Sequence, residues 1–485
     1  MRARPPASAA DVIGRLVMAA NPMALIALDR LVRTSWRWDE GVPLVGDDLL
    51  AQLDPPAALG VLGIACSQRD GHGREEALRR VAARSGGPEL RFILLRLDDW
   101  VAPVRTLAIA AASARMAPAY AATWVECLPC LAALSLRGRV RESSFCAWIR
   151  RWLAGPELRE TLQAGMGHAD PRVRLEAFRL GADLPDAPLR ELVERAWRRD
   201  DPNLRSRAVQ LAVERLQGAD LSWLARTAAA DPCARIAVQG LDLMSKLDPG
   251  SAKAELERAL LHATETVRWA ARYYLGKVGM SGFAEVYREA LRSERVPVVR
   301  AALGGLEQTG SAEDLERVRA FLDHEHGSVV RAALRTRWKL DRAGARRLAL
   351  GMLLDPRAGV WSAAARLVEP LVSEREVDEL WRAVTGAPHA RARLRALALL
   401  WRCPWWIALP RTLRAMELGE ELRAASGRWI LAWLGGDHRR RTYAPPPAPP
   451  EAWTCCARAV RETRGIDPAL VGRIEAALEK ARRLT

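Results

Sequence analysis

The chain has 485 residues and a formal net charge of +16, with 49% hydrophobic and 27% charged residues. This apolar content can supply a large core, so the composition excludes a globally disordered chain. The 34 Gly and 29 Pro follow no triplet period, which excludes a collagen. Two biases remain: 18 Trp stand against 5 Phe and 5 Tyr, and 69 of the 74 basic residues are Arg.

The apolar segment near the N-terminus is too short and too interrupted to cross a membrane. Its longest uncharged stretch, 16–28, has 13 residues and contains Pro22, whereas a span needs about 20 residues. Pro5, Pro6 and Arg15 also break the pattern of a secretory signal. The eight Cys are spread through the chain, which argues against a disulfide framework. We therefore expect a cytoplasmic protein with no membrane insertion.

A short motif recurs from residue 74 onward. Each copy contains a turn, an apolar residue, an Arg and, after two residues, a small apolar residue. The intervals between the aligned arginines are 30 to 36 residues over nine copies, and such a period is typical of a repeat protein. The aligned residues are Arg74, Arg105, Arg141, Arg174, Arg205, Arg235, Arg268, Arg300 and Arg331. Beyond them the register blurs, although Pro356 and Pro388 still mark turns 32 residues apart.

Each copy of the motif is predicted to form two helices. Apolar residues recur at i, i+3, i+4 and i+7 in segments 254–263 and 266–278. Asp-Pro pairs are typical of a helix start, because Asp accepts bonds from the free amides and Pro suits the first helical position. Such pairs occur at 170–171, 201–202, 231–232 and 355–356. The pattern predicts an all-α fold, a curved α-solenoid of about ten to twelve antiparallel helix pairs that is capped at both ends.

The segment DPRVRLEA at 170–177 resembles the HEAT-repeat superfamily, especially its short bacterial branch of phycobilisome-lyase-like HEAT repeats. The resemblance extends from Arg74 to at least Leu400. It implies a ladder of turn Asp and Arg between neighbouring repeats, at Asp170/Arg174, Asp201/Arg205 and Asp231/Arg235. The ladder should fail at Arg300 and Arg331, where Val296 and Gly327 replace the Asp. The branch name mentions a lyase, but the repeat itself carries no chemistry.

The repeats define the expected domain organisation. Residues 1–60, with Trp36 and Trp38, are predicted to form an N-terminal helical cap, because a first repeat needs its open face covered. Residues 61–400 form the repeat solenoid, and 401–442 form C-terminal helical repeats or a cap. Residues 443–450 (YAPPPAPP) should be an extended polyproline spacer. Residues 451–485 form a helical tail, whose last helix could fold back over the region before the spacer.

The sequence contains little that points to catalysis. None of the seven His lies in a recognised catalytic motif, and no Gly-rich phosphate loop follows a strand. Cys127 and Cys130 form a C-x-x-C, for which Cys146 and His168 are conceivable partners. A second C-x-x-C at zinc spacing is missing, and a redox motif requires a strand-to-helix context. We therefore expect buried thiols, no metal, no cofactor and no enzyme activity.

The tryptophans fall into two groups. Trp124, Trp197, Trp223 and Trp381 precede the turns and are expected to pack between helices. Trp401, Trp405 and Trp406 instead lie within six residues around Pro404 and are difficult to bury together. Residues 401–485 also have the highest net charge of the chain, +6, and include Arg439, Arg440 and Arg441. Since Trp and Arg are enriched in interface hot spots, we predict that these three Trp and three Arg contribute to partner binding; a C-terminal core is the alternative for the Trp.

These observations favour a non-enzymatic scaffold or adaptor that binds a partner protein on a solenoid surface. The alternative is a nucleic-acid-binding HEAT-like protein, including one that acts like a DNA glycosylase, because Arg-rich grooves with aromatic platforms bind single strands. A weaker alternative is a prosthetic-group lyase or chaperone that acts on a partner protein, suggested by the family name alone.

Overall fold

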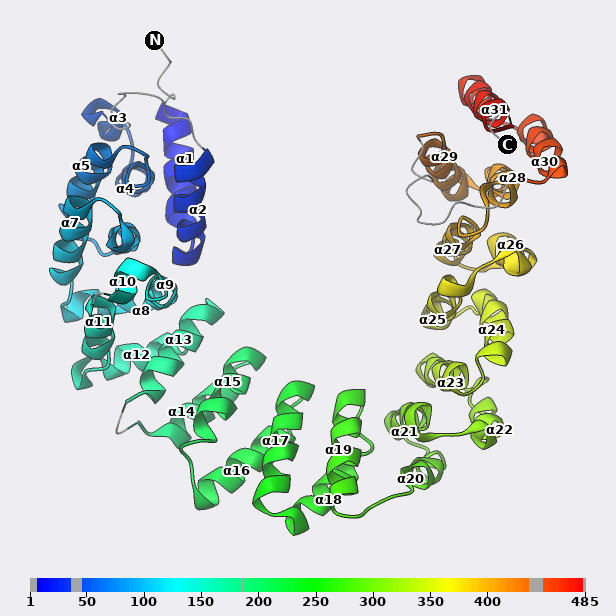
Figure 1. Cartoon of the computed structure of the whole chain (residues 1–485), viewed down its shortest axis with the longest axis horizontal. Coiled ribbons are helices and arrows are strands. Elements are labelled where there is room, and N and C mark those ends of the chain that lie inside the picture. The colour runs from blue at the N-terminus through cyan, green and yellow to red at the C-terminus, as the bar shows by residue number, and fades with distance from the viewer. Residues whose placement is uncertain (1–6, 36–45, 143, 185–186, 436–447, 483–485) are drawn as a thin grey trace. The chain divides into compact units, whose positions relative to one another are not determined.

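The computed structural model describes residues 7–35, 46–142, 144–184, 187–435 and 448–482. Within these ranges the protein has 31 α-helices and no β-strand, so it is the all-α solenoid that the sequence predicts (Figure 1). The chain divides into two compact units, Met1–Met244 (unit 1) and Ser245–Thr485 (unit 2). None of the described helices combines the length and the apolar character that a membrane crossing requires.

Unit 1 contains the helices α1 (Ala7–Ala19), α2 (Pro22–Ser35), α3 (Asp47–Ala51), α4 (Pro55–Ala65), α5 (Gly71–Ala82), α6 (Leu90–Leu95), α7 (Ala102–Ser113), α8 (Ala121–Glu126), α9 (Leu128–Leu134), α10 (Gly138–Glu142), α11 (Phe145–Leu153), α12 (Arg159–Gly165), α13 (Pro171–Ala182), α14 (Leu189–Trp197), α15 (Pro202–Ala212), α16 (Gly218–Ala229) and most of α17 (Ala234–Leu247).

Unit 2 contains the helices α18 (Pro249–Ala259), α19 (Glu265–Lys277), α20 (Phe283–Ala290), α21 (Val296–Thr309), α22 (Leu315–Arg319), α23 (Gly327–Leu340), α24 (Arg342–Gly351), α25 (Ala358–Val368), α26 (Val377–Gly386), α27 (Ala390–Leu400), α28 (Trp405–Ala415), α29 (Glu420–Leu434), α30 (Pro450–Glu462) and α31 (Pro468–Arg482).

Helix pairs build both units. From α12 onward most even-numbered first helices pack against the odd-numbered second helix that follows, as in α12 with α13, α20 with α21 and α26 with α27. Second helices also pack against one another, as α13 against α15 and α21 against α23. Each pair therefore buries its apolar side against its neighbours, which is how a repeat protein builds a continuous core.

At the start of unit 1, α1 and α2 pack against helices of the first repeats; the N-terminal cap over residues 1–60 stays a prediction. Helix α1 packs against α4, and α2 packs against α6 and α9. Gly14 and Gly60 make the contact of α1 with α4 possible, because a Cβ atom on Gly14 would lie 2.2 Å from the carbonyl oxygen of Ala57. The two helix backbones therefore touch, and any larger residue at either Gly would push them apart.

Two of the four Asp-Pro pairs start a second helix in the predicted way. Asp170 caps α13 and Asp201 caps α15, and each side chain accepts a hydrogen bond from an amide of the first turn. The prediction is wrong for the other two pairs, because α17 begins at Ala234 and α25 at Ala358, three residues after the Asp. Asp231 and Asp355 instead accept the amide two residues on, at Cys233 and Arg357.

The predicted ladder between repeats exists in unit 1. Arg205 donates from Nε to Asp231 of the next turn at 2.7 Å, and its other guanidinium nitrogens donate to the same carboxylate and to the carbonyl of Arg199 in its own turn. Arg174 makes the same two kinds of bond, to Asp201 at 2.6 Å and to the carbonyl of His168 at 2.8 Å. Each arginine thus forms hydrogen bonds both within its own turn and with the turn of the next repeat.

The ladder does not continue at Arg235, where the resemblance implied that it should. Arg235 is exposed and donates to the carbonyl of Pro202 and the side chain of Asn203. The late start of α17 is the physical reason. Arg174 and Arg205 are each the fourth residue after the cap of their helix, whereas α17 begins only at Ala234. Arg235 is therefore in the first turn of α17 and lies on a different side of the helix. The ladder fails at Arg300 and Arg331, as predicted.

The register explains those two failures better than the missing Asp does. Arg295 and His326 are the residues before α21 and α23, so the fourth residue after each cap is Val299 or Val330, both of which are buried. Arg300 and Arg331 come one residue later.

Arg268 shows what happens when the next turn offers no carboxylate. Its side chain is buried, and its guanidinium donates only to the carbonyls of His262 and Ala263 in its own turn. The Nε atom has no hydrogen-bond partner, and burial lowers the pKa of Arg268. Gly304 of α21 lies directly beside this guanidinium, since a Cβ there would meet it at 2.5 Å.

In unit 2, two ion pairs between repeats start from arginines of first helices. Arg288 of α20 donates to both oxygens of Asp314, at 2.7 and 3.0 Å, and Arg346 of α24 pairs with Glu376 at 2.6 Å. Both acids belong to capping boxes, with Ser311 and Ser373, in front of α22 and α26. The carboxylate again fixes the start of a helix and binds an arginine of the preceding repeat.

We predict that Arg205→Ala lowers the free energy of unfolding by about 1–3 kcal/mol, because buried Asp231 loses its charged hydrogen bonds. Urea denaturation measures this effect. Arg235→Ala is the matched control, since Arg235 is exposed and pairs with no carboxylate in the described part of the chain. Equal stability of the two variants would show that the ladder does not hold the repeats together.

Candidate functional site

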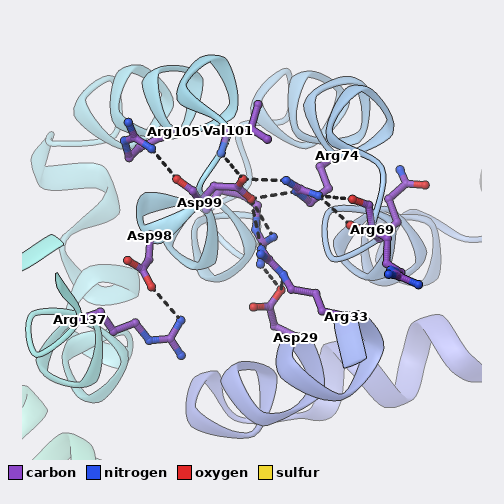
Figure 2. Close-up of polar contacts among 11 residues, drawn as sticks. Asp29, Arg33, Arg69, Arg74, Asp98, Asp99, Val101, Arg105 and Arg137 are labelled. Atoms are coloured by element: carbon purple, nitrogen blue, oxygen red, sulfur yellow. Dashed lines mark hydrogen bonds and ion pairs between the residues drawn. The ribbon is translucent and has the colours of Figure 1, made fainter. Parts of the chain in front are cut away.

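The densest group of charges in unit 1 surrounds Asp99 (Figure 2). Arg74 donates to both oxygens of Asp99, at 2.9 and 2.8 Å, and both side chains are fully buried. Arg33 donates to the same carboxylate at 3.2 Å, and Arg96 lies 3.3 Å from it. Arg96 also binds Asp29 of α2. Since Arg33 and Asp29 belong to α2, the cluster attaches that helix to the first repeats.

The turns before the second helices share a feature that the sequence analysis missed. A polar side chain two residues before the helix cap accepts the backbone amide of the cap residue, at 2.8–3.1 Å. The side chains are those of Asp99, His168, Asp231, His262, Ser293, His324 and Asp355. The three His accept through Nδ1 and so hold their ring proton on Nε2. Their place in the turns gives them a structural role.

The C-x-x-C thiols lie in the core of unit 1. Cys127, Cys130 and Cys146 are all buried. Burial raises the pKa of Cys127 to about 12 and that of Cys146 to about 11. A thiol with so high a pKa is mostly protonated and is a poor nucleophile and metal ligand. Within the described residues, no three His, Cys, Asp or Glu side chains gather in a way that could hold a metal ion.

The three C-terminal tryptophans predicted as a binding site belong to a hydrophobic core cluster of unit 2. Trp401 and Trp406 are each only 7% exposed, whereas Trp405 is half-buried. The ring of Trp405 contacts those of Trp406, Trp433 and Trp453, with centroids 5.3–5.7 Å apart. Trp401 and Trp406 therefore occupy the core position that the sequence analysis gave as their alternative. Arg439, Arg440 and Arg441 lie outside the described residues.

Helices α30 and α31 complete this Trp cluster. Helix α30 packs against α28, and α31 packs against α30 and α29. Cys456 of α30 is fully buried and points its Sγ at the carbonyl of Trp406. Both helices of the tail thus pack against the helices that carry the tryptophans. The sequence analysis suggested this for the last helix, α31, but did not identify α30 as a separate helix.

Asp201 shows how the ladder affects the charge of its carboxylates. Burial alone would raise its pKa, but hydrogen bonds from Arg174 and from the amides of Leu204 and Asn203 outweigh burial. The pKa of Asp201 is therefore below its usual range. A carboxylate of this kind stabilises the fold only while it is ionised.

No protein-family model and no curated protein matches this chain. Among solved structures it is similar to Kap95p in a structure with RanGDP (12% identity, TM-score 0.37, covering 98% of this chain and 69% of that one). It is also similar to Kap121p (13%, 0.34, 95% and 54%) and to importin beta (11%, 0.34, 98% and 66%). The chain spans 54–69% of the length of these proteins. The helix pairs themselves show the all-α solenoid; the HEAT-repeat resemblance and its bacterial branch stay predictions.

We predict that acid removes the contribution of Asp201 to stability. With its pKa lowered in the folded state, this contribution is complete above the unfolded value of about 3.9 and is lost as the pH falls through the folded value. The stability difference between the native chain and Asp201→Asn should therefore shrink below about pH 4. Thermal melts from pH 7 to pH 2.5 measure it, with the exposed Asp200→Asn as control. A constant difference across this range would contradict the prediction.

We predict that Trp406→Ala lowers the free energy of unfolding by about 3–5 kcal/mol, the usual cost of truncating a buried Trp. Trp405→Ala should cost less, because Trp405 keeps part of its surface in water. Urea denaturation of both variants gives the order. If both lose the same amount, Trp405 is as much a core residue as Trp406.

Proposed function

We propose that the chain is a non-enzymatic scaffold in the cytoplasm that binds a partner protein on the surface of its helix repeats. A stack of helix pairs offers each partner a row of side chains from successive repeats. Binding then depends on a few large side chains that stand out of this surface.

One observation carries the proposal: Trp148 is exposed to solvent on α11, a helix whose opposite face packs into the core. Helix α11 buries Cys146, Ile149 and Leu153 in unit 1, yet Trp148 is 47% exposed. The ring of Trp148 lies 5.7 Å from that of Phe145. Two adjacent aromatic rings on a firmly held helix form a rigid apolar anchor, which is the type of side chain that dominates protein interfaces.

The C-terminal region remains a second proposed contact. Trp405 keeps part of its ring surface in water while Trp406, Trp433 and Trp453 hold it in place. We propose that Trp405 contacts the partner and that Trp401 and Trp406 support it from the core. Arg439, Arg440 and Arg441, which lie outside the described residues, are also proposed to contribute to partner binding. The lyase or chaperone alternative is supported by the family name alone.

The test uses the full chain with a photo-crosslinking residue at position 148 or, separately, at 405. The partner that crosslinks in host cells is purified and titrated into the protein by calorimetry. Trp148→Ala should weaken binding about tenfold or more, as loss of an aromatic anchor does, with the melting temperature unchanged.

Trp100→Ala is the matched control, because Trp100 of unit 1 is 53% exposed and lies outside α11. Equal binding by the native chain and Trp148→Ala would remove α11 from the interface. If Trp405→Ala then abolishes binding, the C-terminal contact alone is correct. If neither variant weakens binding, the proposed interaction surface is wrong.

A further inference from the structure

The second helices of unit 2 expose one regular row of side chains. Counted from the cap residues Thr264, Arg295, His326 and Arg357, the fifth, ninth and thirteenth positions follow the i, i+4, i+8 spacing of one helix face. On α19 these are Trp269, Tyr273 and Lys277; on α21 Arg300, Gly304 and Gln308; on α23 Arg331, Arg335 and Lys339; on α25 Ser362 and Arg366. We call these positions the cationic row.

Most of the charged and aromatic side chains of the row are exposed, although Arg331 is half-buried and Gly304 is buried, and no row position carries an acidic residue. Trp269 is 58% and Tyr273 45% exposed. Arg300, Arg335 and Arg366 are exposed, and none of them forms an ion pair with a residue that the structure describes. Burial raises the pKa of half-buried Glu307, and its carboxylate interacts electrostatically with Arg335 and Lys339. The cations of the row still outnumber the carboxylates beside them, so a surplus of positive charge is available to an anionic ligand.

The row crosses four neighbouring helices. Helix α19 packs against α21, α21 against α23 and α23 against α25, and Figure 1 shows the last three side by side. Packed helices lie 8–10 Å apart, so the row extends over about 30 Å. This length suits an extended polyanion.

The same positions in unit 1 show that the fold does not require positive charge there. Counted from Asp170, the row positions on α13 are Leu175, Arg179 and Asp183. On α15, counted from Asp201, they are Ser206, Gln210 and Glu214. Unit 1 thus has mixed charge at these positions, whereas every charged residue at the row positions of α19, α21, α23 and α25 is a cation. The difference therefore belongs to the surface of unit 2 and not to the architecture of the repeat.

Two exposed aromatic rings lie at one end of the row. The rings of Trp269 and Tyr273 are stacked, with centroids 5.4 Å apart and planes 8° from parallel. The ammonium group of Lys277 lies over the Tyr273 ring, 4.6 Å from its centroid. Exposed aromatic rings beside a positively charged track are what single-stranded nucleic acids bind, because bases stack on the rings and phosphates follow the cations.

An acidic peptide is the competing ligand, because clusters of arginine also bind acidic motifs. The exposed rings of Trp269 and Tyr273 favour nucleic acid, since bases stack on exposed aromatic rings beside a positively charged track.

We propose that the cationic row binds single-stranded nucleic acid, with Arg300, Arg331, Arg335, Lys339 and Arg366 on the phosphates and a base stacked on Trp269 and Tyr273. The guanidinium fork of Arg matches phosphate oxygens. This activity goes beyond the proposed protein scaffold and is independent of the contacts at Trp148 and Trp405.

The test is fluorescence anisotropy of a labelled 20-nucleotide oligothymidylate, titrated with the full chain at several salt concentrations. Binding should weaken with salt, and Arg335→Glu/Arg366→Glu should weaken it more than tenfold. The slope of log K against log salt should become shallower by about 0.7 for each phosphate that the variant no longer neutralises. Trp269→Ala/Tyr273→Ala should weaken binding about tenfold, the effect of removing one base stack. An oligouridylate should behave in the same way, since no contact in the row requires a deoxyribose.

The control for charge is Arg347→Glu/Arg375→Glu, which changes the net charge equally at exposed arginines outside the row. Melting temperatures verify that all variants fold. If this control weakens binding as much as the row variant, net charge alone attracts the oligonucleotide and the proposal is wrong. It is also wrong if polyglutamate competes as well as the oligonucleotide, or if duplex DNA binds more tightly and the aromatic variant has no effect.

Discussion

The fold depends on a buried guanidinium that bridges two turns. Removing an arginine from water is costly unless its N–H groups find acceptors. Arg174 and Arg205 meet this condition with the carbonyls of their own turn and with the carboxylate of the next one. The carboxylate in turn accepts amides that the following helix cannot satisfy itself. One interaction therefore closes a turn, starts a helix and sets the spacing of neighbouring repeats.

Unit 2 shows how the array changes when this interaction is interrupted. Buried Arg268 has no carboxylate opposite it, and Gly304 leaves room for its guanidinium. Beyond Arg268, Asp314 and Glu376 form ion pairs with arginines of first helices, whereas Glu369 pairs with Arg395 of the second helix α27. Arg335 and Arg366 on second helices are exposed and form no ion pair with a residue that the structure describes, which leaves their charge available to a ligand.

The sequence predicts the helix pairs and part of the ladder because both follow from short local patterns. It does not predict the partner of Arg74, since Asp99 precedes no Pro and lies outside the Asp-Pro pattern. The prediction that Arg235 belongs to the ladder is wrong, because the number of residues from an Asp-Pro pair to the start of the helix differs between turns. The burial of Trp401 and Trp406 depends on α30 and α31, which come after the spacer, so local sequence does not reveal it. The cationic row becomes visible only when residues are counted from the observed caps.

The double role of the ladder arginine also bears on how such an array changes length. The bonds from Arg174 to the carbonyls of His168 and Ala169 lie within one repeat, so a duplicated or deleted repeat keeps them. Only the bond to Asp201 reaches across the boundary. A new junction between repeats then needs a single acid at the right place in the following turn. Of the polar contacts of this arginine, a new junction has to rebuild the one with that acid, whereas a change inside a turn disturbs two repeats at once.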